Sequence, residues 1–165
     1  MASDDRVLRE QLVNLLKGKQ AHADIGSALA GFPVEKAGDR PTGLPYSAWQ
    51  LLEHMRITLA DLLDFATNSE YKERPWPASY WPKEVAPASA DAWSKSVKAL
   101  HADLAAFEKL IQDPASNLYS TIPWGAEGQT LLREVLLAAD HTSYHTGEFI
   151  VLRRLLGAWT SSSRV

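Results

Sequence analysis

Apolar residues return at three- and four-residue steps in four stretches of the chain, which is the spacing that places them on one face of a helix. The predicted helices cover residues 3 or 4 to 30, 47 to 67 or 68, 89 to 111, and 130 to 156. Gly18 and Gly26 weaken the first helix, because a glycine inside a helix costs on the order of 1 kcal/mol relative to alanine. Nothing between the four stretches alternates in the manner of a strand. The pattern therefore predicts an all-α four-helix bundle.

Two of these helices carry clear end signals. Ser47 and Gln50 have the spacing of a capping box, in which the serine oxygen accepts an N–H of the first turn and the glutamine reaches back to the cap. Gly157 is placed to stop the last helix, and Arg153 and Arg154 lie in its final turn, where positive charge suits the helix dipole.

The connections between the predicted helices are longer than the ~2–8 residues usual in a bundle. The second connection, residues 69–88, is rich in aromatic residues and proline and is long enough to return the chain along the bundle, which would make the second and third helices parallel. Trp76, Trp81 and Trp124 lie in such loops and are candidates either for the wall of an apolar pocket or for plugs over the ends of the bundle. The plug is the interpretation that we favour.

Length and charge narrow the class of protein. With 165 residues we expect a single domain over residues 1–165. The chain has 17 basic and 20 acidic residues and a formal net charge of −3, which gives no reason to expect a nucleic-acid partner. No apolar run is long enough for a membrane span, and the first residues lack the basic-then-apolar layout of a secretory signal. We therefore expect a cytoplasmic protein that binds neither nucleic acid nor membrane.

The chain has no cysteine, so it has no disulfide, no cysteine nucleophile and no thiolate ligand for zinc. Nitrogen and oxygen atoms must hold any metal ion. Interest therefore turns to the five histidines, which are His22, His54, His101, His141 and His145.

His141 and His145 are four residues apart, so on a helix both rings project from one face and can bind one ion at ~2.0–2.1 Å per nitrogen. The protease-type zinc motif fails, because Thr142 stands where that motif needs glutamate. His54, next to Met55 of the apolar stripe, is placed to supply a third imidazole from a neighbouring helix. The alternatives are capped or partly exposed rings for the pair, and an interfacial ring hydrogen-bonded to a carbonyl for His54.

Several segments carry a resemblance to a known family. They are residues 47–54 (SAWQLLEH), residues 139–148 (ADHTSYHTGE), residues 152–157 (LRRLLG), and the approach to the last helix at residues 122–125 (IPWG). Together they resemble the DinB/YfiT-like superfamily over most of the chain, from the first helix to Trp159.

The resemblance implies a four-helix bundle in up-down-down-up order, with a metal site formed by His54, His141 and His145. Characterised relatives include transferases and isomerases that use the thiols bacillithiol or mycothiol, and relatives are often dimers, so a homodimer is expected. This chain departs from the family at Glu148, where relatives often carry glutamine.

Four further residues are candidates for the site. Glu148 follows His145 by three residues on the same face and is predicted as a catalytic base, with a fourth metal ligand or an acceptor for an imidazole N–H as alternatives. Asp140 is expected to face solvent or another helix. His22, predicted on the apolar stripe of the first helix, is either a further ligand or substrate contact or an interior histidine with its own partner. His101 is expected on the surface.

These observations favour a metal-dependent enzyme acting on a small molecule. Three neutral imidazoles leave coordination places open, as in catalytic sites. Zinc is the expected cofactor, with nickel(II) or iron(II) as alternatives. Combined with the resemblance, this points to thiol-dependent transfer or hydrolysis, with a low-molecular-weight thiol as partner. The alternatives are a non-catalytic metal-binding or stress-response module, and a helical interaction protein without metal.

Overall fold

The computed structural model describes residues 3–159, with the side chains from residue 5 onward. In this part of the chain there are five α-helices and no strand beyond one isolated bridge between Thr121 and Thr130. The helices are α1 (Ser3–Lys17), α2 (Ile25–Leu29), α3 (Ala48–Thr67), α4 (Ala90–Gln112) and α5 (Leu131–Leu155). Two short 3₁₀ helices, η1 (Val34–Lys36) and η2 (Ala78–Tyr80), lie in the loops. The prediction of an all-α protein is confirmed.

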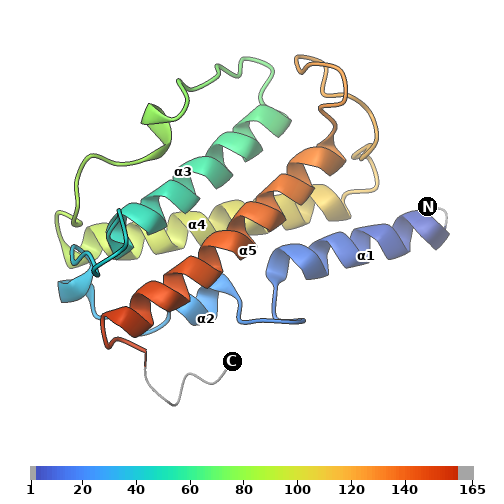
Figure 1. The fold of residues 1–165 in the computed structure, drawn as a ribbon. Coiled ribbons are helices and arrows are strands. Elements are labelled where there is room, and N and C mark those ends of the chain that lie inside the picture. Colours follow the sequence, from blue (N-terminus) through green and yellow to red (C-terminus); the bar gives the residue numbers. More distant parts are fainter. Residues whose placement is uncertain (1–2, 160–165) are drawn as a thin grey trace.

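The long helices pack in a ring in which α3 contacts α4 and α5, and α1 contacts the same two helices from the other side. Residues 68–89 carry the chain back along α3, so α3 and α4 run in the same direction (Figure 1). Helices α1 and α5 run in the opposite direction. The core between them is aliphatic and aromatic. Its fully covered members include Leu51, Met55, Phe107, Val135 and Phe149.

The predicted single helix over residues 3–30 is wrong. The helix ends at Lys17, and Gly18 and Lys19 follow with φ of 69° and 71°. This left-handed conformation ends a helix and is easy for glycine alone. The short α2 begins only after Asp24, whose carboxylate accepts the backbone N–H of Ser27 at 2.9 Å. His22 therefore lies in an exposed loop and not on a buried stripe.

The other predicted helix ends agree with the structure to within one residue. The capping box is confirmed, since the Ser47 hydroxyl accepts the N–H of Gln50 at 3.2 Å and the Gln50 side chain accepts the N–H of Ser47 at 3.3 Å. Gln50 also donates to the carbonyl of Pro82 at 3.2 Å. The start of α3 is thus fastened to the loop of residues 68–89. No helix in the described chain is both long and apolar enough to cross a membrane.

Candidate metal centre

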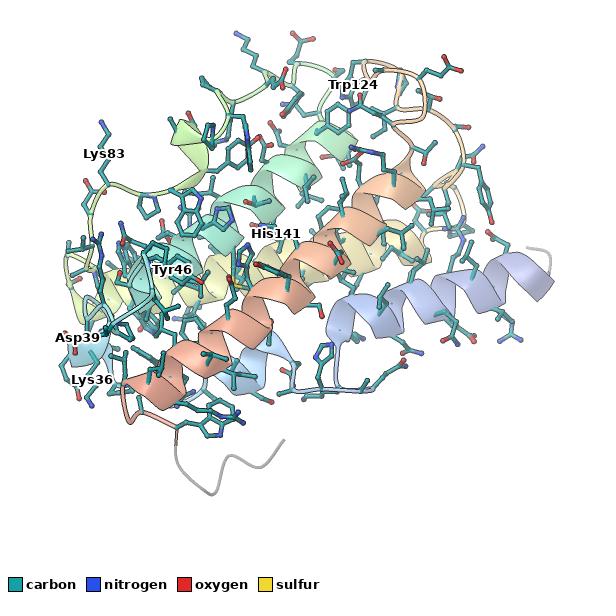
Figure 2. All side chains as sticks on the ribbon, in the orientation of Figure 1. Lys36, Asp39, Tyr46, Lys83, Trp124 and His141 are labelled. Atoms are coloured by element: carbon teal, nitrogen blue, oxygen red, sulfur yellow. The ribbon has the colours of Figure 1, made fainter. Side chains whose placement is uncertain are left out.

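Three histidines from two helices meet near the middle of the bundle. His54 comes from the second turn of α3, and His141 and His145 come from successive turns of α5. Their ligand nitrogens all lie within 4.8 Å of one another, and these three residues are called the histidine triad below. The structure thus brings together the three residues that the sequence predicts as metal ligands. Figure 2 shows His141 midway along the bundle, away from Trp124 at the end of α3.

The distances within the triad suit a common ion. Nε2 of His54 lies 3.2 Å from Nε2 of His145 and 3.1 Å from Nε2 of His141. Two nitrogens that each lie ~2.0–2.1 Å from a tetrahedral ion are about 3.3 Å apart. The side chains therefore need little movement to bind one cation.

In His54 and His145, the hydrogen-bond partner of Nδ1 determines which ring nitrogen carries the hydrogen. Nδ1 of His54 lies 2.9 Å from the carbonyl oxygen of Tyr80, and Nδ1 of His145 lies 2.6 Å from a carboxylate oxygen of Glu148. Both partners accept only, so each Nδ1 carries the hydrogen and each neutral ring has a lone pair on Nε2. The contact between His54 and His145 then joins two lone pairs, which is unfavourable unless a cation lies between them.

Neither His54 nor His141 is a favourable site for a proton. Burial lowers the pKa of His54, and the neighbouring His145 lowers it further, although the Tyr80 carbonyl opposes both effects. Burial together with His145 and His54 lowers the pKa of His141 to about 3. These rings are therefore neutral at physiological pH, which is the state that binds a metal ion.

An aromatic stack covers one side of the triad. The Trp81 ring lies parallel to the His54 ring, with centroids 4.0 Å apart and planes at 4°, and the Tyr46 ring stacks on Trp81 with centroids 5.4 Å apart. Burial raises the pKa of Tyr46, and Glu148 raises it further through a hydrogen bond and its charge, so the phenol stays protonated. The stack fixes the His54 ring in place.

A buried carboxylate anchors the loop that carries Tyr80. Asp61 of α3 accepts the Tyr80 hydroxyl at 2.6 Å and also contacts the hydroxyl of Tyr71 and the guanidinium of Arg74. Burial and the Asp61 charge raise the pKa of Tyr71 to about 12, so this phenol also remains a hydrogen-bond donor. Asp61 thus holds the backbone whose carbonyl orients His54.

The remaining predicted candidates lie around the triad rather than within it. Glu148 lies on the Nδ1 side of the His145 ring, where it acts as the acceptor for the imidazole N–H, one of the predicted alternatives. Its predicted role as a catalytic base stays a prediction. Asp140 is exposed, as expected, and lies beside His141. His22 is near α5, with Nε2 3.0 Å from the Ser143 hydroxyl, and is outside the triad. His101 is exposed.

Of the three loop tryptophans, one is a plug at the end of the bundle and two belong to the site. Trp124 donates its Nε1 hydrogen to the carbonyl of Phe65 at 2.8 Å, and so covers the end of α3 as a plug. Trp81 and Trp76 belong to the site, the first as the stack on His54 and the second in the wall of the adjoining pocket. The density of aromatic residues in residues 69–88 was the sequence signal for this wall, but it does not tell which ring packs where.

Comparison with known families agrees with this geometry. The sequence model of the DinB superfamily matches residues 18–149, which is most of the chain and includes the whole triad. The chain therefore belongs to the DinB superfamily. The match leaves out α1 and the turns after Phe149. No curated protein and no solved structure matches the chain.

Proposed function

We propose that the protein is a metal-dependent enzyme whose divalent cation is held by His54, His141 and His145. The observation that carries this proposal is the convergence of three imidazole Nε2 atoms, with that of His54 3.2 Å from His145 and 3.1 Å from His141, which is the spacing of ligands on one cation. Zinc is the ion that we propose, because a set of imidazole ligands suits it; nickel(II) and iron(II) accept the same ligands. We also assign the four long helices to the up-down-down-up order.

The arrangement favours an open site over a closed structural one. Three protein ligands leave at least one coordination place free for a further ligand. A pocket that could hold such a ligand adjoins the triad. A divalent cation in such a site lowers the pKa of a bound thiol or water toward neutrality, which supplies a nucleophile to a protein without cysteine. Thiol-dependent transfer is the reaction class that we propose first, and hydrolysis second.

The protein's own side chains have separate tasks in this scheme. The Tyr80 carbonyl and the Trp81 ring orient His54, and Glu148 accepts the Nδ1 hydrogen of His145. Such acceptors set the tautomer and raise the basicity of a ligating imidazole. Glu148 is therefore a positioning residue in the proposed site.

Metal analysis of the untagged protein tests the proposal. We expect about one equivalent of divalent metal in the wild type and none in His54→Ala or His145→Ala, with the helical circular dichroism retained. His101→Ala and His22→Ala are matched controls and keep the metal, because both residues lie outside the triad. Metal that survives in the triad variants contradicts the site, and loss of the fold on metal removal assigns it a structural role.

Activity needs a second test with the metal-loaded protein. Low-molecular-weight thiols are offered together with electrophiles, and esters are offered alone. Thiol consumption that disappears in His145→Ala but not in His101→Ala supports the enzyme. A metal-loaded protein that is inactive toward every thiol and ester supports the non-catalytic metal-binding module instead.

A further inference from the structure

A pocket of about 360 Å³ adjoins the histidine triad. Besides the three rings, its apolar wall is built by Leu62 of α3, Leu137 and Tyr144 of α5, and Trp76 of the loop. This volume is in the range of about 300–1,000 Å³ usual for small-molecule sites, which are also mainly apolar with a few polar groups. The pocket therefore has the size and the lining of a ligand site with the triad at one side.

Large apolar side chains in the wall of this pocket are exposed to solvent. Trp76 is 73% exposed, Tyr144 63% and Leu137 37%. Covering this apolar surface is favourable by about 25 cal/mol per Å². A ligand with an apolar body placed on the triad would cover all three side chains.

Charge at the rim restricts the ligand further. Among the described residues that line the pocket, Asp140 is the one acidic side chain, and none is lysine or arginine. The basic residue on the same face of α5 is Arg133, seven residues earlier, and its guanidinium is bound to Glu134 at 2.7 Å. A carboxylate or phosphate on the ligand body would thus meet a like charge and no positively charged side chain of the pocket.

We infer that this pocket binds a small molecule with one metal-binding head group and an apolar, uncharged body, and that Asp140 selects against bodies that carry a carboxylate or phosphate. The inference rests on the metal site proposed above and adds the class of ligand. Leu137 and Trp76 supply affinity through the apolar contact, whereas Asp140 supplies the selection.

Two matched thiols test the inference with the full-length cobalt(II)-loaded protein. Phenylmethanethiol has an uncharged aromatic body, and 4-(mercaptomethyl)benzoate adds a carboxylate. The dissociation constant of each is read from the thiolate-to-cobalt absorption, which does not depend on turnover. We expect the uncharged thiol to bind about tenfold more tightly, since two like charges a few ångströms apart at a protein surface repel by about 1–2 kcal/mol.

Three variants separate the parts of the inference. Asp140→Asn should bring the two thiols to within about threefold of each other, because it removes the repulsion. Asp39→Asn makes the same change of charge at an exposed position at the end of the bundle near Lys36 (Figure 2) and should leave the tenfold difference intact. Leu137→Ala should weaken both thiols about fivefold through lost apolar contact.

The outcomes are distinguishable from failure of the metal site. If the protein does not take up cobalt, the proposed function and this inference both fail. If cobalt binds but the carboxylated thiol binds as tightly as the uncharged one, or neither thiol binds because a second copy of the chain fills the pocket, this inference alone is overturned. A preference that persists in Asp140→Asn overturns the role of Asp140.

Discussion

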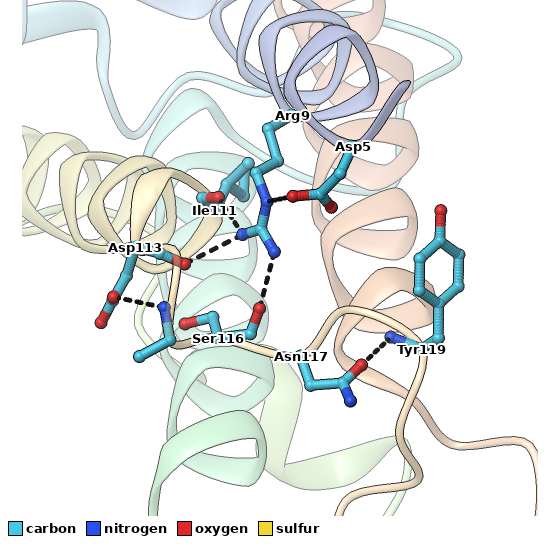
Figure 3. Close-up of polar contacts among 8 residues, drawn as sticks. Asp5, Arg9, Ile111, Asp113, Ser116, Asn117 and Tyr119 are labelled. Carbon is cyan, nitrogen blue, oxygen red and sulfur yellow. Dashed lines mark hydrogen bonds and ion pairs between the residues drawn. The ribbon is translucent and has the colours of Figure 1, made fainter. Parts of the chain in front are cut away.

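Arg9 and the histidine triad are both buried groups of nitrogen atoms, but their nitrogens face different partners. Arg9 is 7% exposed, and its guanidinium donates to the carbonyls of Ile111 at 2.6 Å, Asp113 at 3.0 Å and Ser116 at 2.7 Å, and to the Asp5 carboxylate at 2.9 Å (Figure 3). Each of its nitrogen atoms thus has an oxygen partner within the protein. In the triad, by contrast, the Nε2 atom of His54 faces other imidazole nitrogens, those of His141 at 3.1 Å and His145 at 3.2 Å.

The difference separates a structural cluster from a site for a ligand. Buried polar groups that are fully paired inside the protein stabilise the fold and leave nothing for a ligand to do. The Arg9 cluster ties α1 to the end of α4 in this way. Buried lone pairs that face one another cost free energy until something positive binds them. By this criterion the triad is the functional centre and the Arg9 cluster is a part of the scaffold.

The largest expected effect comes from breaking the paired cluster. Arg9→Met leaves the carbonyls of Ile111 and Ser116 and the Asp5 carboxylate without their donor, so we expect the free energy of unfolding to fall by about 3 kcal/mol. Metal bound per folded molecule should not change. Chemical denaturation measures the fall. Arg6→Met is the control, because its exposed pair with Glu10 contributes less than about 1 kcal/mol; equal effects of the two changes would contradict the assignment.

Binding of zinc to the triad should raise the free energy of unfolding, by slightly less than Arg9→Met lowers it. Zinc at a free concentration a hundredfold above its dissociation constant should raise the free energy of unfolding by about 2.7 kcal/mol, because it binds the folded state. Calorimetry with and without chelator measures this shift. His54→Ala should remove it and His101→Ala should keep it. The same rise in His54→Ala would mean that the zinc binds elsewhere.

The sequence predicts the local parts of this molecule well and the long-range parts less well. The capping box at Ser47 and Gln50 and the four-residue spacing of His141 and His145 are local patterns, and both occur as expected. The break after Lys17 was missed because apolar spacing continues across Gly18, although the backbone there turns left-handed. The stack of Trp81 on His54 and the position of the Tyr80 carbonyl depend on how the loop of residues 68–89 folds over α3, which periodicity does not specify.

The support behind the His145 ring gives a third prediction. Glu148→Ala removes the acceptor of the Nδ1 hydrogen and should weaken metal binding about tenfold, the lower end of the range for such partners. Glu148→Gln keeps a neutral acceptor and should weaken it less. Competition with a chelator of known affinity gives the two constants. An unchanged constant in Glu148→Ala would show that the carboxylate does not support the ligand.

The smallest expected effect concerns the support behind His54. Tyr80→Phe removes the hydroxyl that binds Asp61 at 2.6 Å but keeps the backbone carbonyl that accepts from His54. We expect a loss of metal affinity of about threefold, since a single hydrogen bond contributes about 0.5–1.5 kcal/mol and acts here only through the loop. Tyr119→Phe is the control, because that side chain is 63% exposed. Equal metal affinities in the two variants would show that the Asp61 anchor does not contribute to metal binding.

X-ray absorption at the metal edge of the zinc-loaded protein measures the ligands of the proposed metal centre themselves. We expect three imidazole nitrogens at ~2.0–2.1 Å, one or two further light-atom ligands from solution, and one imidazole fewer in His54→Ala. A spectrum with fewer than three imidazoles, or one that does not change in His54→Ala, would contradict this metal centre.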